Sequence, residues 1–230
     1  MKQVFPMIFL FLTCVSWADV TDPGNQPVGM PVIIDRPIRF DAARVKLTLA
    51  YRRAHQDKAA SDTTITPRVI VLHYTGGRSF QSAWAYFNNL QVEASRKGLA
   101  QAGAVNVSAH FVVDRDGTIY RLLPETMMAR HVIGLNHVAI GVENVGDGKK
   151  YPLTDAQIAA DAALVRYLAA RHPITHLLGH YEAKRMRSHA YYVEKDPAYR
   201  DDHDDPGERF MTSVRAKLGD LALQGPSAKP

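Results

Sequence analysis

The 230-residue sequence contains a single cysteine, Cys14, close to its N-terminus. If a leader peptide carries that residue away, the mature chain has no disulfide framework. No run of lysines and arginines with interleaved aromatic residues occurs, so nucleic-acid binding is not expected. The formal net charge of +5 is a mild excess. It suits an anionic partner such as a cell-wall polymer, and it equally suits solubility alone.

The N-terminal segment has the features of a secretory leader. Lys2 is followed by an apolar stretch over residues 4–15 and then by the small residues Ser16 and Ala18. This pattern predicts a signal peptide over residues 1–18, cut after Ala18. The stretch is too short to form a stable transmembrane helix, so we expect a periplasmic or secreted protein without a membrane span. A lipid anchor on Cys14 is the alternative, although the residues before it are not small.

The remaining chain has ordinary globular composition, with 46% hydrophobic and 22% charged residues. We expect an N-terminal extension over residues 19–62, with a Pro- and Gly-rich arm and a strand and short helix between Ile38 and about Tyr51. One domain with a sizeable core is expected over residues 63–220. A disordered tail is expected over residues 221–230.

Apolar runs and helical periodicities alternate along the predicted domain. Runs rich in β-branched residues predict buried strands at residues 68–73, 138–143 and 174–178. Apolar residues at helical spacing predict helices at residues 79–96, 154–171 and 208–218. A strand–turn–strand pattern over residues 107–122, with Asp116-Gly117 in the turn, predicts a hairpin. Together they predict a single α/β domain with a mixed central β-sheet flanked by helices.

Three polar residues stand where metal ligands are expected. His73 and His180 each end an apolar run, and ligands bind at the carboxyl ends of strands in open α/β sheets. Asp205 opens the rigid turn Asp205-Pro206-Gly207. Two imidazoles, a carboxylate and an open fourth position form a catalytic zinc site, which we place at the rim of the sheet. The alternatives are capping or surface roles, and residues 202–204 offer competing ligands.

Glu143 ends a predicted strand after four small or apolar residues. Burying a carboxylate there is unfavourable unless it is paired or functional, and a carboxylate beside a zinc-bound water can act as general base. A strand-end residue turned toward solvent is the alternative. His110 and His131 also flank strand-like segments, either as groups around the site or as ordinary core histidines.

Five segments, in this order, resemble the type 2 N-acetylmuramoyl-L-alanine amidases, the peptidoglycan amidases related to the peptidoglycan recognition proteins. They are residues 69–75, 106–122, 129–143, 178–180 and 205–210. The resemblance extends over about residues 32–218. It implies that His73, His180 and Asp205 bind Zn²⁺ and that Glu143 is the catalytic glutamate.

The resemblance also implies a substrate cleft lined by His131, and we expect His110 and Tyr74 to contact the substrate. Many bacterial members have a lysine two residues before the ligand aspartate, where it steadies the developing oxyanion. His203 occupies that position here and is expected to take this catalytic role with less positive charge. The longer loop over residues 185–201 is expected to form a wall of the cleft.

The implied activity is zinc-dependent hydrolysis of the amide bond between the lactyl group of N-acetylmuramic acid and L-alanine. The expected partner is peptidoglycan or a muropeptide, and we expect a monomer. Two alternatives remain open, a muropeptide-binding module of the same fold without catalysis and a zinc peptidase that cuts within the stem peptide.

Overall fold

The computed structural model describes residues 30–200 and 202–227. The predicted signal peptide with Cys14 and the cut after Ala18, and the first part of the predicted arm, lie outside the described residues. From residue 31 onward the described residues form one compact unit, which therefore includes the later part of the predicted extension. Within the described ranges, no helix combines the length and the apolar content that crossing a bilayer requires.

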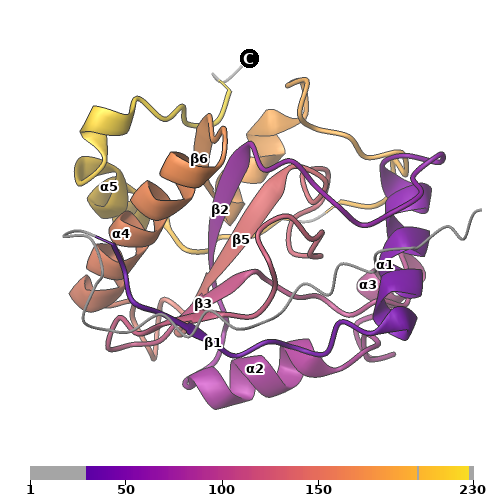
Figure 1. Cartoon of the computed structure of the whole chain (residues 1–230), viewed down its shortest axis with the longest axis horizontal. Helices are drawn as coiled ribbons and strands as arrows, with labels where there is room; N and C mark the ends of the chain where they lie inside the picture. Colours follow the sequence, from indigo (N-terminus) through magenta and orange to yellow (C-terminus); the bar gives the residue numbers. More distant parts are fainter. Residues whose placement is uncertain (1–29, 201, 228–230) are drawn as a thin grey trace, which may run out of the picture. The chain divides into compact units, whose positions relative to one another are not determined.

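A six-stranded mixed sheet forms the centre of this unit (Figure 1). Its strands are β1 (Ile33–Asp35), β2 (Val69–Tyr74), β3 (Phe111–Val113), β4 (Ile119–Arg121), β5 (Ala139–Asn144) and β6 (His176–Gly179). The spatial order is β1-β4-β3-β5-β2-β6. The β3–β4 pair is antiparallel, as the predicted hairpin requires, and the other pairs are parallel. The predicted fold class is confirmed.

Helices cover the sheet and extend beyond it. They are α1 (Ala42–His55), α2 (Phe80–Asn88), α3 (Lys97–Gln101), α4 (Asp155–Arg171) and α5 (Glu208–Ala216), with 3₁₀ helices η1 (His180–Met186) and η2 (Gly219–Leu221). Helix α4 begins as predicted, because Thr154 and Gln157 form a reciprocal capping box. The helix predicted over residues 79–96 was too long. It ends at Asn88, since Gln91 pairs with Val105 in an isolated bridge.

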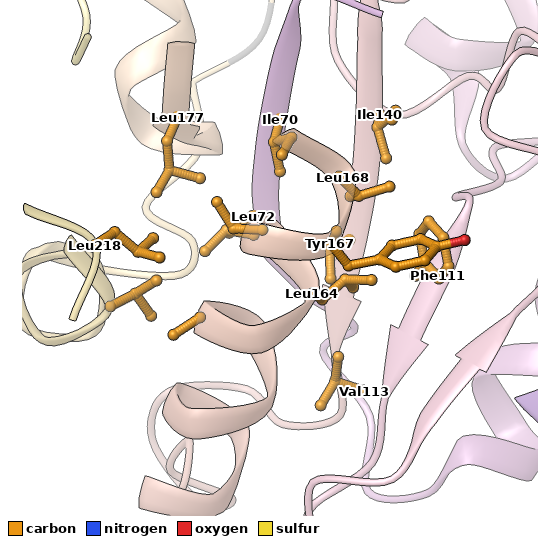
Figure 2. Close-up of a cluster of buried hydrophobic side chains, with 14 of the residues drawn as sticks. Ile70, Leu72, Phe111, Val113, Ile140, Leu164, Tyr167, Leu168, Leu177 and Leu218 are labelled. Atoms are coloured by element: carbon orange, nitrogen blue, oxygen red, sulfur yellow. The ribbon is translucent and has the colours of Figure 1, made fainter. Parts of the chain in front are cut away.

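The two faces of the central strands pack against different partners. Ile70, Leu72 and Ile140 pack on the inner face of α4, where Leu164 and Leu168 point toward the strands (Figure 2). Residues at the alternate positions of β2 and β5 belong to a second cluster on the opposite face, with Val132, Leu135 and Met186. Because side chains alternate along a strand, His73 and Glu143 fall on this second face.

The predicted extension is part of the fold rather than an external arm. Strand β1 pairs with β4, so the strand expected after Ile38 lies earlier in the chain. Helix α1 is longer than expected, and Asp41 caps its first turn. The buried Arg44 donates through Nη2 to the carbonyls of Phe87, Asn88 and Asn89. The end of α2 leaves these carbonyls unpaired, so Arg44 joins α1 to α2.

The C-terminal segment is described up to residue 227. Gln224 exchanges backbone hydrogen bonds with the sheet: its N–H donates to Thr175, and its carbonyl accepts from Leu177. The segment expected to be disordered from residue 221 is therefore attached beside β6 at this point. The last part of that expectation, residues 228–230, lies outside the described residues.

The contact between α4 and the sheet predicts a large effect of core truncation. Leu168→Ala should lower the free energy of unfolding by about 2–5 kcal/mol, because it leaves a cavity between α4 and β2. Urea denaturation measures this change. Ala159→Ser, at an exposed position of the same helix, is the control and should change it by less than about 0.5 kcal/mol. Equal effects of the two substitutions would contradict the assigned packing.

Candidate active site

Strand pairing brings three of the predicted residues into one row. His73 on β2 is paired with Glu143 on β5, and Leu72 is paired with Gly179 on β6. His180, the first residue after β6, therefore comes beside His73. Residues in register on neighbouring parallel strands point to the same face, so a row of polar side chains leaves the carboxyl ends of β5, β2 and β6.

The turn that carries Asp205 joins this row from the C-terminal side. The backbone N–H of Tyr181, in η1, donates to the Asp205 carbonyl over 2.9 Å. Gly207 has φ +93°, a conformation that favours glycine, and α5 begins at the next residue. Helix α5 therefore follows the turn directly. This arrangement fixes the Asp205 carboxylate so that it faces the two histidines.

His73, His180 and Asp205 form a compact buried group. Nδ1 of His73 lies 3.1 Å from Nδ1 of His180, and each of these nitrogens lies 3.2 Å from an Asp205 carboxylate oxygen. One ligand atom from each residue falls within 4.8 Å of the others. Asp202 instead pairs with Lys184, and Asp204 accepts from Tyr74, so the neighbouring carboxylates are engaged elsewhere.

The protonation states of His73 and Asp205 favour the binding of a cation. Burial and the neighbouring His180 ring lower the pKa of His73 to about 4, so its imidazole is neutral at pH 7 and offers a lone pair. Burial alone would raise the pKa of Asp205, but hydrogen bonds from His180, His203 and His73 hold it well below its usual range. Two imidazole nitrogens and one ionised carboxylate are a donor set that fits zinc.

His131 lies against His73 and also lines the cleft, as the resemblance implied. Its Nδ1 is 3.1 Å from His73 Nε2, and its own Nε2 is 3.3 Å from the carbonyl of Ala139. A His73 that presents Nδ1 to a metal carries its proton on Nε2 and donates it to His131. The ring of His131 needs the space over Gly141, where a Cβ would lie 2.6 Å from the His131 ring.

His110 is a core residue and does not contact the cleft, contrary to its expected substrate-binding role. Its side chain is fully buried. Its Nδ1 accepts from the Gly141 N–H at 3.0 Å, and its Nε2 donates to the Met127 carbonyl at 2.7 Å. Both ring nitrogens are thus used to join β5 to the loop that follows β4, which is the core-histidine alternative.

Glu143 points into the site with one oxygen unpaired. Its Oε2 is buried, and no hydrogen-bond partner for it occurs among the described residues. Burial and the nearby Asp205 raise the pKa of Glu143 to about 8, against the opposing influence of His180 and Arg96. A carboxyl group whose pKa lies close to physiological pH can both accept and return a proton there.

A cavity of 280 Å³ opens beside the His–His–Asp group. His73, Glu143, His180 and Asp205 line it, together with three further predicted residues: Tyr74, His131 and His203. Tyr74 donates to Asp204 over 2.7 Å, and burial together with this bond raises the pKa of its hydroxyl. The ring of His203 stacks on that of His180 at a centroid distance of 4.0 Å.

Sequence reasoning missed several residues of this cavity wall. Tyr51 comes from α1, and Arg130 and Asn136 come from the loop before β5. Asn136 accepts from the backbone N–H groups of His131 and Val132, which fixes the loop beside His73. What distinguishes these residues is that they are polar and line a cavity inside the fold. The sequence of a loop does not show which of its residues are buried, so it gave no usable signal for them.

The loop after η1 contributes one of its three tyrosines to the cavity. Tyr199 lines the wall, and its hydroxyl accepts from Arg130 at 3.0 Å. Tyr191 and Tyr192 pack instead against the cluster that contains Val69 and Val71. The loop therefore forms a wall of the cleft on one side and covers the sheet on the other.

A buried acid–amide pair lies beneath the row of site residues. Asp161 of α4 is fully buried and accepts from Asn144 Nδ2 at 2.9 Å. The same amide nitrogen is 3.3 Å from the carbonyl of His73. Burial raises the pKa of Asp161 to about 7, against the opposing hydrogen bond from Asn144. The pair connects α4 to the strand ends that carry His73 and Glu143.

The fold and the site together define an α/β protein with a candidate metal centre at the carboxyl ends of its central strands. A family model described as N-acetylmuramoyl-L-alanine amidase matches residues 63–208, which is more than half of the chain. The chain belongs to this amidase family, and the family resemblance predicted from its sequence is confirmed.

Individual proteins are also similar to this chain. An endolysin of Escherichia phage T7 is 32% identical over 99 residues, which cover 41% of this chain and 66% of the endolysin, just under two thirds of its length. The solved amidase LysC from Clostridium intestinale URNW superposes with a TM-score of 0.51 and 22% identity, covering 85% of this chain and 100% of that chain. The endolysin LysCS from the same organism gives the same TM-score and identity and is covered to 98%. At this identity the structural likeness concerns the fold.

The buried Asp161 predicts a pH-dependent loss of stability. The carboxyl group ionises near its ordinary pKa of 3.8 in the unfolded chain and near 7 in the folded one. The folded state therefore holds an extra proton, and stability falls as the pH rises through this interval. Asp161→Asn should remove this dependence, so that the variant gains up to roughly 4 kcal/mol relative to the wild type between pH 4 and pH 8.

Urea titrations at several pH values measure this gain. Asp155→Asn, at the exposed start of the same helix, is the matched control and should leave the pH dependence in place. An Asp161→Asn variant with the pH dependence of the wild type would show that Asp161 is ionised in both states.

Proposed function

We propose that this protein is a zinc-dependent N-acetylmuramoyl-L-alanine amidase that hydrolyses the bond between the lactyl group of N-acetylmuramic acid and L-alanine. The observation that carries the proposal is the convergence of His73, His180 and Asp205, with Glu143 beside them, on one cavity. Membership of the amidase family supports the same substrate class. Peptidoglycan or a soluble muropeptide is the proposed partner.

His73, His180 and Asp205 are the proposed zinc ligands. Bound zinc lowers the pKa of a water molecule to about 7 and polarises a carbonyl group. Glu143, in register with His73, takes a proton from the attacking water and delivers it to the leaving amine of L-alanine. The C–N bond breaks, and the products are the lactyl carboxylate and a stem peptide with a free amino terminus.

His203 and Tyr74 are placed to act on the polar groups of the substrate. His203 stacks on His180, and its Nδ1 lies 3.4 Å from an Asp205 oxygen. An imidazole N–H directed into the cavity stabilises negative charge on the carbonyl oxygen as water adds. Tyr74 keeps its proton and orients Asp204 at the cavity mouth.

His131 is proposed as a positioning residue for His73. The hydrogen bond from His73 Nε2 to His131 fixes the tautomer that presents Nδ1 to the metal. The Ala139 carbonyl and the Asn136 side chain hold His131 in turn. This role adds to the substrate contact that the sequence suggested, since the side chain also borders the cavity.

A periplasmic or secreted location is part of the proposal. The predicted leader over residues 1–18 supports it, and a polymeric cell-wall substrate would be met there. A monomer suffices for the proposed chemistry, because all of the proposed ligands and the general base belong to one chain. The complete ligand set with Glu143 favours an enzyme over a binding module of the same fold.

Glu143 tests the catalytic proposal. Glu143→Gln should reduce turnover of a soluble muropeptide by about 10²–10⁴-fold, because the amide cannot carry the proton. Zinc content, measured by metal analysis of the dialysed protein, should remain that of the wild type. Glu208→Gln, at an exposed position in the first turn of α5, is the control and should keep full activity.

Mass spectrometry of the products separates the possible functions. Release of an intact stem peptide supports the amidase. Cleavage within the peptide indicates a peptidase, and tight binding of an uncut muropeptide by the zinc-loaded protein indicates a binding module. Full activity in Glu143→Gln would remove this residue from the mechanism.

His131 tests the proposed metal centre independently of activity. His131→Ala should weaken zinc affinity by roughly 10–100-fold, because His73 loses the group that fixes its ring. Competition with a chromophoric chelator gives the affinity, and circular dichroism checks the fold. His172→Ala, at the end of α4 and outside the cavity lining, should leave the affinity unchanged. An unchanged affinity in His131→Ala would assign this residue to another role.

A further inference from the structure

Two of the proposed zinc ligands come from segments that are separate in the chain. His180 begins η1 directly after β6, and Asp205 lies in the turn before α5. Close to the ligands, the Tyr181 N–H bonds to the Asp205 carbonyl. The apolar face of α5 packs in the core beneath α4, but apolar packing is non-directional. The angle between the two segments therefore depends on how the far end of α5 is attached.

A buried ion pair attaches that far end. Glu182 belongs to η1 and is 5% exposed, and Arg215 lies in the last turn of α5. Nη1 of Arg215 donates to Oε1 of Glu182 at 2.9 Å, and its Nη2 donates to Oε2. Two parallel bonds of this kind fix the orientation of the two groups as well as their distance. The pair thus aligns α5 with η1.

The same pair also bonds to the backbone of β6 just before His180. Glu182 Oε2 accepts from the Gly179 N–H at 2.8 Å, and Arg215 Nη2 donates to the Leu177 carbonyl at 2.8 Å. Helix α5 has nine residues and is therefore about 13 Å long. Its two attachments to the segment around His180, one at each end, are separated by nearly this length.

The junction between β6 and η1 lies in close contact with α5. A Cβ at Gly179 would lie 2.7 Å from the Tyr181 ring and 2.9 Å from Met211 of α5. Space for even one additional carbon atom is therefore missing here. A shift of α5 is transmitted to the backbone beside His180, because nothing between them can absorb it.

We infer that Glu182 and Arg215 are positioning residues that set the distance between the ligands His180 and Asp205 and thereby the zinc affinity of the site. The inference rests on the proposed function, which assigns these ligands. Neither Glu182 nor Arg215 lines the cavity, so both act through the segments that they join. Zinc binds its ligands at about 2 Å in a tetrahedral arrangement. A small displacement of one ligand therefore weakens the binding of the metal.

A second ion pair of the same form provides the matched control. Arg166 of α4 donates through Nη1 and Nη2 to both carboxylate oxygens of Asp220 and through Nη2 to the Lys217 carbonyl. This pair joins α4 to η2, and neither partner lines the cavity. It is more exposed than the pair of Glu182 with Arg215. Stability and zinc affinity are therefore measured separately for every variant.

The first test replaces the guanidinium group while keeping its charge. Arg215→Lys should weaken zinc affinity roughly tenfold, because an ammonium group cannot form the two parallel bonds to Glu182. Arg166→Lys is the control and should keep the affinity of the wild type. Competition with a chromophoric chelator gives the affinity, and urea denaturation of the metal-free full chain gives the stability. The visible absorption of bound Co²⁺ should change in Arg215→Lys only, since it reports the coordination geometry.

The second test separates positioning from stability. Glu182→Gln combined with Arg215→Met removes the ion pair, but the glutamine oxygen can still accept from the Gly179 N–H. Replacing a buried ion pair by uncharged side chains of similar volume often preserves stability. If the pair positions the ligands, zinc affinity stays roughly tenfold weaker in this variant even when its stability equals that of the wild type. A merely structural pair predicts that affinity returns with stability.

The outcomes distinguish this inference from the proposed function. Wild-type zinc affinity in either folded variant overturns the inference and leaves the amidase standing, and if one variant does not fold, the other decides. If the wild type binds zinc but cleaves no muropeptide, the proposed amidase is wrong, while the affinities still decide the role of Glu182 and Arg215. If the wild type binds no zinc, both are wrong.

Discussion

The register of three parallel strands is the constraint on which the site depends. Pairing of β2 with β5 places Glu143 beside His73, and pairing of β2 with β6 brings His180 to the other side. A shift of either strand by one residue would turn its side chains to the opposite face. The apolar residues at alternate positions prevent that shift, because Ile70, Leu72 and Ile140 must stay against α4.

Buried polar groups connect this row to the rest of the molecule. His131 holds His73 from one side, and the Asn144–Asp161 pair holds its backbone from the other. Farther out, Arg130 joins the cavity wall to Tyr199 of the long loop. Such groups are costly to bury unless they find partners. Each one that does so fixes the relative position of two segments, which is how a site assembled from distant parts of the chain becomes rigid.

Much of the fold was predictable because its signals are local. The strand at residues 69–74, the hairpin and the capped helix α4 follow from periodicity, an Asp-Gly turn and Thr154 with Gln157. The end of α2 was not predictable, since it depends on the Gln91–Val105 bridge. The packing of α1 into the domain was not predictable either, since it depends on the contact between Arg44 and the end of α2. His110 and His131 looked alike in sequence, and only their partners separate a core residue from one beside the site.

The sequence by itself determined the fold class, the family and the residue types that converge at the strand ends. Periodicity and strand-end histidines are recognised from residues that are close together in the sequence. The tertiary structure decided which of the neighbouring acids joins the two histidines, where His131 acts, and that an ion pair of Glu182 with Arg215 joins η1 to α5. These features depend on distances between segments far apart in the chain. Such distances are set only when the core packs and its buried polar groups find their partners.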